Sequence, residues 1–501
     1  MKEFPSALPV YRATELREIE RLAAPAGTAP LMRRAGLAAA DVACQRLLAD
    51  GGSVLVLAGP GNNGGDALWV ARHLKDRWFR VDVVFTGKAA KLSPEAREAL
   101  EAWREAGGEP LTEIPPHGRW DAVVDGLFGV GLGRDLEGRH LELVERVNAL
   151  GLPVLALDVP SGLCGDTGRV RGAAVRAALT VTFIALKPGL LTHSGTEHCG
   201  EIVLRDLGVD APALLPPRMR VLDRDSAVAP LAPRPANSHK GSFGSAGILG
   251  GAPGMSGAAF LAGRAALKLG AGRVYLGMLA DRFPPLDTRQ PELMVRRAAE
   301  VLALEHLTSL AVGPGMGHDR EASRALDAAL KSRLPLVLDA DALNLLAGNA
   351  RLQRALRRRH APAILTPHPA EAARLLGSDT AAVQDDRVAA AEELAKRHNA
   401  LVVLKGAGSI CASPGGVVWI NTTGNPGLAS AGQGDVLSGM IAAFLAQGLD
   451  AADALHLGVF LHGAAADALV ERGIGPIGLT AVEVIDAARE LLNAWVYSPK
   501  P

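Results

Sequence analysis

The chain has 501 residues, of which 48% are hydrophobic and 21% charged, and its 53 basic residues balance its 53 acidic ones. This composition is typical of a globular protein, and the length exceeds one ordinary core, so we expect two domains. The balanced charge excludes nucleic acid and anionic membranes as electrostatic partners. The first twenty residues lack the apolar h-region of a signal peptide, no apolar run reaches the roughly 18 residues needed for a membrane span, and the cysteines form no paired motif, so we expect a cytoplasmic protein.

The first half alternates apolar segments with amphipathic ones. We predict buried strands at 53–59, 80–87, 121–129, 153–162, 179–186 and 201–209. Helices are predicted at 66–76 and 93–108, the second with Ser93 as N-cap and Pro94 in its first turn. This alternation predicts an α/β fold with a doubly wound parallel sheet.

The first strand runs into GPGNNGGDA, residues 59–67, a glycine-rich turn. Gly59, Gly61 and Gly64 match the dinucleotide-binding pattern, but the next strand ends in Thr86–Lys88 without the acidic residue that such a site requires. A dehydrogenase is therefore the least favoured hypothesis. The structural alternative is a tight turn that Asp66 caps.

Polar residues follow two further strands. Asp125 ends one, and Asp158 ends the next, with Ser161 close behind. Amide, carboxylate and hydroxyl oxygens suit an alkali or alkaline-earth cation. Asp158 could instead act as an acid or base. Each aspartate alone is compatible with a turn or cap, but three such strand ends in one sheet favour a site.

The two halves meet in a proline-rich segment, 211–240. It has prolines at 212, 216, 217, 230, 233 and 235. Such a segment predicts an extended connection rather than a packed element. We place the domain boundary near residue 225, giving domains 1–225 and 226–501.

The second half repeats the alternation. Strands are predicted at 245–251, 273–279, 310–317, 335–342, 362–368 and 400–409. Helices are predicted at 257–272, 319–332, 387–399, 435–448 and 455–471.

We expect the functional residues of the second half to follow directly after its strands, because open parallel sheets bind ligands at that end of their strands. Lys405, followed by glycines, resembles a phosphate cradle, and no Walker motif is present. Gly432–Gly434 could hold a transferring phosphate while Asp435 deprotonates the acceptor hydroxyl. Alternatively, Asp435 is a carboxylate in the first turn of a helix, where the helix dipole stabilises its negative charge. For His368 the alternatives are ligand contact and capping. For Asp339 and Asp341 they are metal contact through water and capping.

Taken together, the motifs resemble one family. GPGNNGGD, DGLFGVGL and DVPSG resemble the epimerase domain of the bifunctional nicotinamide-nucleotide-hydrate repair enzymes. HKGSFG, RQPELMV, GPGMG, LDADALNLL, TPHPAEAARLL, KGAGS and GNPGLASAGQGDVLSG resemble their ADP-dependent dehydratase domain. The resemblance implies a Rossmann-like N-terminal domain and a ribokinase-like C-terminal domain.

It also implies an activity. The N-terminal domain would interconvert the R and S forms of NADHX and NADPHX, with K+ bound. The C-terminal domain would convert the S form to NADH or NADPH with ADP and Mg2+, releasing AMP and phosphate. We also expect a homo-oligomer. The alternatives are a small-molecule kinase with an N-terminal binding domain, and a protein whose first domain only binds.

The resemblance extends to individual residues. It assigns potassium to Asn63, Asp125 and Ser161. It assigns the hydrate to Asn62, Asn63, Gly64, Gly65, Asp66, Gly129, Val130, Gly131, Leu132, Gly133, Arg134, Asp135 and Asp158 in the first domain, and to Ala258, Gly317, His368 and Asp435 in the second. It assigns the nucleotide to Lys405, Gly406, Ala407, Gly408, Ser409 and Gly434. We predict Asp158 and Asp435 as the catalytic residues. Ala67, Ala370 and Gln433 depart from the family pattern without removing a polar group.

Overall fold

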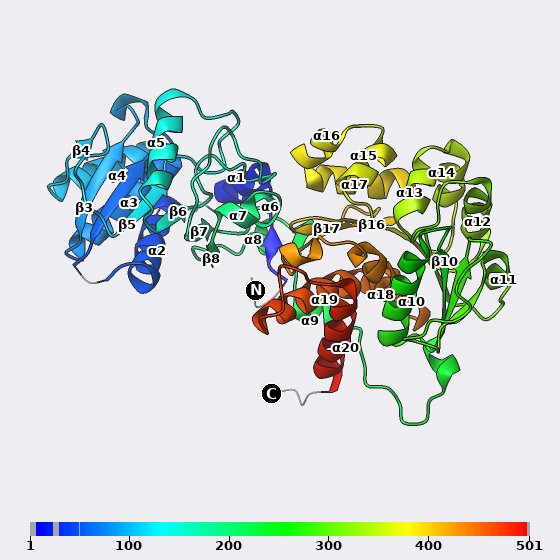
Figure 1. The fold of residues 1–501 in the computed structure, drawn as a ribbon. Helices are drawn as coiled ribbons and strands as arrows, with labels where there is room; N and C mark the ends of the chain where they lie inside the picture. Colours follow the sequence, from blue (N-terminus) through cyan, green and yellow to red (C-terminus); the bar gives the residue numbers. More distant parts are fainter. Residues whose placement is uncertain (1–6, 24–29, 50, 498–501) are drawn as a thin grey trace. The chain divides into compact units, whose positions relative to one another are not determined.

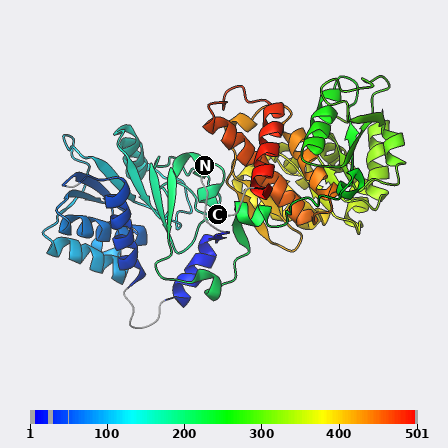
Figure 2. The same cartoon turned by 90° about the horizontal axis from the view of Figure 1, so that it is seen from below.

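The computed structural model describes residues 7–23, 30–49 and 51–497, and its chain divides into two compact units (Figures 1 and 2). The first unit comprises Leu8–Met219, and the second begins at Arg220. Both are α/β units built on largely parallel sheets, which confirms the predicted fold class. Among the described residues, none of the helices has the length and apolar character needed to cross a membrane.

The first unit contains a seven-stranded sheet in the order β4-β3-β2-β5-β6-β7-β8. Its strands are β2 (Ser53–Ala58), β3 (Arg80–Phe85), β4 (Pro110–Leu111), β5 (Ala122–Gly126), β6 (Val154–Leu157), β7 (Leu179–Phe183) and β8 (Glu201–Arg205). All neighbours pair in parallel. The chain moves outward from β2 to β4 and then returns to the other side of β2 with β5. The carboxyl ends of the neighbouring strands β2 and β5 therefore form the switch point, where such sheets bind ligands.

Helices cover both faces of this sheet, as a doubly wound fold requires. They are α1 (Ala13–Leu22), α2 (Leu31–Arg46), α3 (Asn62–Asp76), α4 (Pro94–Glu105), α5 (Gly138–Ala149), α6 (Pro188–Leu191), α7 (Gly195–His198) and α8 (Ala211–Leu214). Val54 and Val56 of β2 pack into one core cluster with α2, α3 and α4. Leu55 and Leu57 point the other way, into a cluster with α5. This alternation follows from the two-residue period of a strand. The short strand β1 (Pro9–Val10) bridges to Leu186.

The second unit, green to red in Figure 1, has a sheet in the order β9-β18-β17-β16-β15-β14-β13-β10-β11-β12. Its strands are β9 (Met219–Leu222), β10 (Ser245–Gly250), β11 (Arg273–Met278), β12 (Met294–Arg297), β13 (Ser309–Val312), β14 (Leu336–Leu338), β15 (Ala363–Leu365), β16 (Leu401–Leu404), β17 (Ser409–Ala412) and β18 (Val418–Asn421). From β16 to β12 in this order, all neighbouring strands pair in parallel. Strand β17 pairs antiparallel with both of its neighbours, β16 and β18.

Helices of the second unit include α18, which will position the site. They are α9 (Arg224–Val228), α10 (Ser256–Lys268), α11 (Ala298–Leu302), α12 (Arg320–Lys331), α13 (Ala340–Ala347), α14 (Ala350–Arg357), α15 (Pro369–Leu376), α16 (Thr380–Asp385), α17 (Arg387–His398), α18 (Gln433–Ala446), α19 (Ala451–Glu471) and α20 (Ala481–Tyr497). Helix α18 packs closely on α10 because Gly439 has no side chain; a Cβ there would lie 2.1 Å from Ala262 O. This close packing buries α18 in the core.

Some local predictions were wrong. The proline-rich segment is not simply an extended connection, because it contains α8, β9 and α9. No proline interrupts residues 219–222, so this stretch can pair as strand β9, and the side chains of Met219, Val221 and Leu222 are buried. Helix α3 begins at Asn62 rather than at Asp66, so Asp66 is not its cap. Ser93 does cap α4, as predicted. The functional boundary at 225 stays a prediction, whereas the contacts divide the chain between Met219 and Arg220.

Candidate active sites

The first candidate site lies at the switch point of the first unit. Asn63 is in the first turn of α3, directly after β2, and Asp125 lies within β5. Ser161 follows β6. The fully buried Ser161 donates from Oγ to Asp125 Oδ1 at 2.6 Å, and its N–H donates to Asp125 Oδ2 at 2.8 Å. The parallel sheet has therefore brought these strand-end residues together.

Asp125 is a fully buried carboxyl group that forms no ion pair with a cationic side chain of the described residues. Burial raises its pKa to about 6, although hydrogen bonds from Ser161 and from the Leu127 backbone lower it. Asn63 Nδ2 donates to Phe128 O and to Leu157 O, at 2.9 and 3.1 Å. Its Oδ1 is buried and has no hydrogen-bond partner among the described residues. An orphaned oxygen beside a carboxylate and a hydroxyl is a donor set that fits a hard cation.

Asp158 follows β6 in a strained backbone conformation. Its φ is 63°, and Val159 N donates to Leu157 O at 2.8 Å, which closes a tight turn around it. A non-glycine residue in this left-handed region costs about 1–2 kcal/mol. Its Oδ1 accepts a hydrogen bond from the buried ammonium of Lys187. Strain of this kind, held by surrounding contacts, is typical of functional positions.

Two further carboxyl groups interact electrostatically with Asp158. Burial, together with the charges of Asp158 and Glu20, raises the pKa of Asp66 well above its usual value, and Lys187 partly offsets this. The pKa of Glu20, on α1, is also raised by burial and by Asp158. The site therefore combines an ion-paired carboxylate with carboxyl groups that hold protons more tightly, which is the pattern of acid–base chemistry.

The predicted hydrate-binding segments lie around these groups. Residues 129–135 form a largely exposed loop after β5, except that Gly129, Val130 and Leu132 are half-buried. Asn62 is exposed. The buried Gly64 has a packing role, because a Cβ there would lie 2.0 Å from Gly59 O. Substrate contact by these residues stays a prediction.

The second candidate site lies at the N-terminus of α18. Gly432 is its N-cap, with φ 88°, and no side chain caps this end among the described residues. Asp435 is in the first turn of the same helix. Free backbone N–H groups of a helix N-terminus bind anions, and the helix runs for 14 residues. The structure thus supports both alternatives for Asp435: a first-turn carboxylate and a group beside an anion site.

Lys405 joins this helix to the strand ends. It follows β16, and its Nζ lies 3.0 Å from Oδ1 of Asp339, which follows β14. Burial lowers the pKa of Lys405, but the charges of Asp339 and Glu371 outweigh it, so the pKa is raised. A Cβ on Gly434 would lie 3.2 Å from Lys405 Nζ. The absence of that side chain leaves room beside the ammonium for a ligand atom.

The charge on Asp435 depends on pH near neutrality. Burial and the negative charges of Asp339 and Asp341 raise its pKa to about 7, and Lys405 opposes the shift. Such a carboxyl group exchanges its proton readily at the pH of a cell, as a general base must.

The remaining predicted residues lie at neighbouring strand ends. His368 caps α15: its Nδ1 accepts from Ala370 N at 3.1 Å, so the capping role is present, and contact with the hydrate stays a prediction. Gly317 N donates to Asp341 Oδ2 at 2.9 Å. Ala258 lies in the first turn of α10. Among the described residues no group of His, Cys, Asp or Glu could hold a metal ion by itself.

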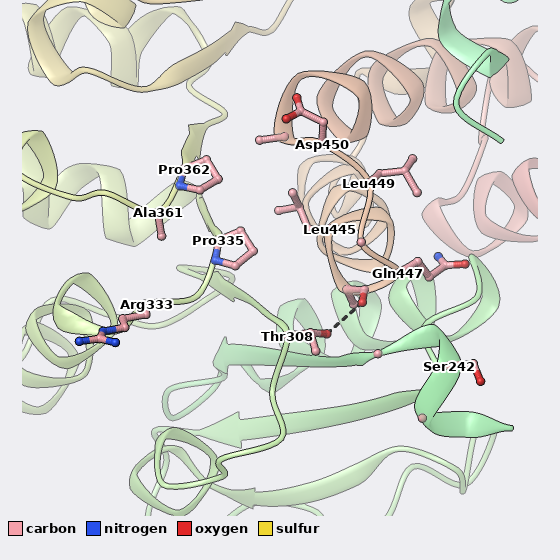
Figure 3. A pocket seen from close by; sticks show the side chains of 15 residues that line it. Ser242, Thr308, Arg333, Pro335, Ala361, Pro362, Leu445, Gln447, Leu449 and Asp450 are labelled. Carbon is pink, nitrogen blue, oxygen red and sulfur yellow. Dashed lines mark hydrogen bonds between the residues drawn. The ribbon is translucent and has the colours of Figure 1, made fainter.

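A loop formed by residues 405–408 connects β16 to β17. Beneath it, the buried Arg387 donates to Ala407 O and to Leu404 O. A Cβ on Gly406 would lie 2.7 Å from the guanidinium. Arg387 therefore holds the loop from the inside. A cavity of about 520 Å³ lies elsewhere, where β10, β13, β14 and β15 begin (Figure 3). It is at the opposite edge of the sheet from the site.

Comparison with known proteins covers both units. A family model described as NAD(P)H-hydrate dehydratase matches residues 246–488, and one described as YjeF-related protein N-terminus matches residues 28–189. The bifunctional NAD(P)H-hydrate repair enzyme Nnr of Coxiella burnetii is 38% identical over 97% of this chain and 99% of its own. The Escherichia coli enzyme of the same name is 39% identical over 99% of this chain and 96% of its own. The chain belongs to the bifunctional NAD(P)H-hydrate repair enzyme family.

Solved structures similar to this family member cover about half of it. One is the ADP/ATP-dependent NAD(P)H-hydrate dehydratase from Bacillus subtilis, co-crystallized with ATP/Mg2+. It is 33% identical, with a TM-score of 0.49, over 54% of this chain and 96% of that one. Another is a ribokinase-like superfamily protein from Enterococcus faecalis, 26% identical with a TM-score of 0.49 over 56% of this chain and 97% of that one.

Sequence reasoning missed three residues of this repair-enzyme chain. Lys187 and Glu20 lie near Asp158, and Arg387 lies beneath the loop after β16. Arg387 and Glu20 fall in charged, helical sequence that resembles a solvated surface. Only Lys187 carried a signal, because it stands between the apolar strand of 179–186 and a proline.

Proposed function

We propose that this chain repairs hydrated nicotinamide nucleotides. Its first unit would interconvert the R and S forms of NADHX and NADPHX. Its second would convert the S form to NADH or NADPH with ADP, giving AMP and phosphate. Membership of the repair-enzyme family over the full length of both units supports the proposal. The observation that carries the dehydration is the arrangement of Asp435, Lys405 and the uncapped start of α18.

Dehydration follows from the chemistry of the leaving group. The ring hydroxyl of the hydrate leaves poorly, and phosphorylation makes it a good leaving group. Asp435 takes the hydroxyl proton, and the oxygen attacks the terminal phosphorus of ADP, which expels AMP. Backbone N–H groups at Gly432–Gly434 and the ammonium of Lys405 stabilise the transferring phosphoryl group. Phosphate then leaves the ring carbon while the neighbouring carbon loses a proton, and the dihydropyridine double bond returns.

Epimerisation is assigned to Asp158 as acid and base. Its carboxylate lies beside the exposed loop 129–135, and the proton-holding Asp66 interacts with it electrostatically. We assign K+ to a site formed by Asn63 Oδ1, the Asp125 carboxylate and Ser161 Oγ. Its positive charge would neutralise the buried carboxylate and attract electron-rich atoms of the substrate.

We further infer that Mg2+ enters the second unit with the nucleotide. Both oxygens of Asp339 are engaged, by Lys405 and by Ser438 Oγ, and Asp341 binds Gly317 N and His318. Mg2+ usually binds to one or two carboxylates together with substrate phosphates, which agrees with the absence of a metal cluster among the described residues. A homo-oligomeric state and a cytoplasmic location stay predictions, to be tested by light scattering and cell fractionation.

The direct test of the second unit supplies the S hydrate with ADP and Mg2+ to the full chain. The expected result is a rise in the near-ultraviolet absorbance of reduced nicotinamide, with one AMP released for each molecule repaired. The competing hypothesis is a small-molecule kinase with an N-terminal binding domain. No recovery of reduced nicotinamide, together with phosphorylation of an unrelated alcohol, would favour that kinase.

A further inference from the structure

Lys187 is a buried lysine whose protons are all engaged inside the protein. It follows β7 directly before α6 and is 1% exposed. Its ammonium donates to Asp158 Oδ1, to Thr182 Oγ1 at 2.9 Å and to Phe183 O at 2.9 Å. An ammonium has three protons to donate, so none remains for a substrate. Lys187 can therefore act only through the groups that it holds.

The group that it holds has two oxygens in different surroundings. Asp158 Oδ1 also lies within 3.4 Å of Thr182 Oγ1 and 3.5 Å of Phe183 N, both interior groups. Oδ2 faces the other way: a Cβ built on Gly129 would lie 3.4 Å from it. Gly129 opens the exposed loop that we predict to bind the hydrate. One oxygen is therefore fixed inside, and the other faces the loop.

The surrounding charge makes this ion pair necessary. The carboxyl groups of Asp66, on α3, and Glu20, on α1, both interact electrostatically with Asp158, and Lys187 offsets this for both of them, together with Arg17 for Glu20. Removing one partner of a buried pair leaves an uncompensated charge. Without Lys187, we expect the carboxylate to turn away from the interior, which would also release the strained backbone of Asp158.

We propose that Lys187 is a positioning residue for epimerisation: it binds Asp158 Oδ1 inside the sheet so that Oδ2 is the oxygen presented to the hydrate. This inference rests on the proposed function of the first unit. It adds Lys187, and Thr182 whose hydroxyl accepts a hydrogen bond from Lys187, to the residues on which the epimerisation rate depends. Neither residue touches the substrate, so the substrate KM should change little.

The chain offers a matched control for the test. Thr180 and Thr182 lie two residues apart on β7, and both are fully buried. Thr182 belongs to the network of Lys187 and Asp158, whereas Thr180 Oγ1 donates to Cys199 O at 2.7 Å. Thr182→Val and Thr180→Val each delete one buried hydroxyl, so a general loss of stability would affect both alike.

The experiment measures conversion of the R hydrate by the full chain, with dehydration of the S hydrate as an internal measure of folded protein. We expect Lys187→Met to lower the epimerisation kcat at least 100-fold, with KM changed less than threefold. We expect Thr182→Val to lower kcat five- to tenfold and Thr180→Val less than twofold. Equal losses in the two threonine variants, or a Lys187→Met effect on KM alone, would overturn the proposal. If Lys187→Met does not fold, the threonine pair decides.

A crystal structure of Lys187→Met, or of Thr182→Val, separates this inference from the proposed function. The expected change is a rotated Asp158 carboxylate, with Oδ2 no longer beside Gly129. If wild type shows no epimerase activity, the proposed function of the first unit fails, and the crystal structure still tests the positioning. An unmoved carboxylate in the variant would refute the role of Lys187 whatever the activity.

Discussion

Asp339 joins Lys405 to helix α18. Its Oδ1 lies 3.0 Å from Lys405 Nζ, and its Oδ2 accepts a 2.7 Å hydrogen bond from Ser438 Oγ. Asp339 is 2% exposed, so this contact is sheltered from solvent. One carboxylate thereby fixes the distance between the ammonium beside Gly434 and the helix that carries Asp435. The nucleotide site and the proposed base are held as one unit.

Asp339→Asn should weaken ADP binding about tenfold, because Lys405 loses its charged partner and its fixed position. The folded state should lose roughly 1–3 kcal/mol, since the partly buried Lys405 loses its ion-pair partner and only the charges of Glu371 and Asp435 remain to offset its own. Ser438→Ala, which removes only the hydroxyl that donates to Asp339 Oδ2, should cost about 1–2 kcal/mol and leave ADP affinity within threefold. Isothermal titration and urea unfolding measure both. Unchanged ADP affinity in Asp339→Asn would show that Lys405 does not need this partner.

Dehydration should depend on the ionisation of Asp435. Its pKa is raised to about 7, and the base must be deprotonated to take the hydroxyl proton. The kcat/KM for the S hydrate, which reports on the free enzyme, should therefore rise with pH, reach half its maximum near pH 7 and level off above pH 8. A profile that is flat from pH 6 to pH 8 would contradict this assignment.

Asp435 should also destabilise the ligand-free protein at high pH. Because the folded-state pKa is raised above the unfolded value, the folded state binds more protons between about pH 4 and pH 7, and stability falls as pH rises through that window. Asp435→Asn should thus abolish dehydration and, at pH 8, stabilise the chain by about 1 kcal/mol, or about 2–4 °C in Tm. Thermal unfolding at pH 5 and pH 8 checks the sign: the stabilisation must be smaller at pH 5.

Asn63 should be needed for potassium binding. Wild type should gain thermal stability in KCl over a bulky organic cation at equal ionic strength, because ligands of the folded state stabilise it. Asn63→Ala should lose that gain. Asn148→Ala is the control, since both its amide atoms are already hydrogen-bonded, to Ala174 O and to Arg176 N. A KCl effect that survives in Asn63→Ala would place the cation elsewhere.

Arg387 should support the nucleotide loop. Arg387→Met is expected to weaken ADP binding about tenfold, because Ala407 O and Leu404 O lose their donor. Arg359 is a matched control: its guanidinium also binds interior carbonyls, those of Ala329, Leu330, Ser332 and Leu334. Arg359→Met should lower Tm but leave ADP affinity within twofold. Similar affinity losses in both variants would mean that Arg387 serves only stability.

The main strands and the grouping of strand-end residues could be predicted from the sequence. Apolar runs such as 53–59 locate parallel strands, and the ends of parallel strands meet at one edge. This is why Asp125 and Ser161 lie within hydrogen-bond distance of each other, and why Asn63 and Ser161 both donate to Phe128 O; their joint role in binding potassium stays a prediction. The antiparallel hairpin of β17 and β18 was missed, because its strands are short and follow a glycine-rich segment.

What could not be predicted depends on tertiary burial. A lysine before a proline at 187–188 does not by itself reveal an ammonium enclosed by three oxygens from β7 and from the end of β6. Similarly, Asn62–Asp66 looks like a loop because asparagine and glycine disfavour helices, yet contacts of Gly64 with Gly59 and of Gly65 with Met32 hold it as the first turn of α3. Packing overrides local propensity at both positions.

The two sites should act as separable catalysts, and mixing two variants tests this most directly. Given the R hydrate and ADP, Asp158→Asn should form NADH only at the spontaneous epimerisation rate, and Asp435→Asn should form none. An equimolar mixture should recover rapid repair, because each variant supplies the activity that the other lacks. A mixture no faster than Asp158→Asn alone would contradict the assignment of epimerisation to the first unit and dehydration to the second.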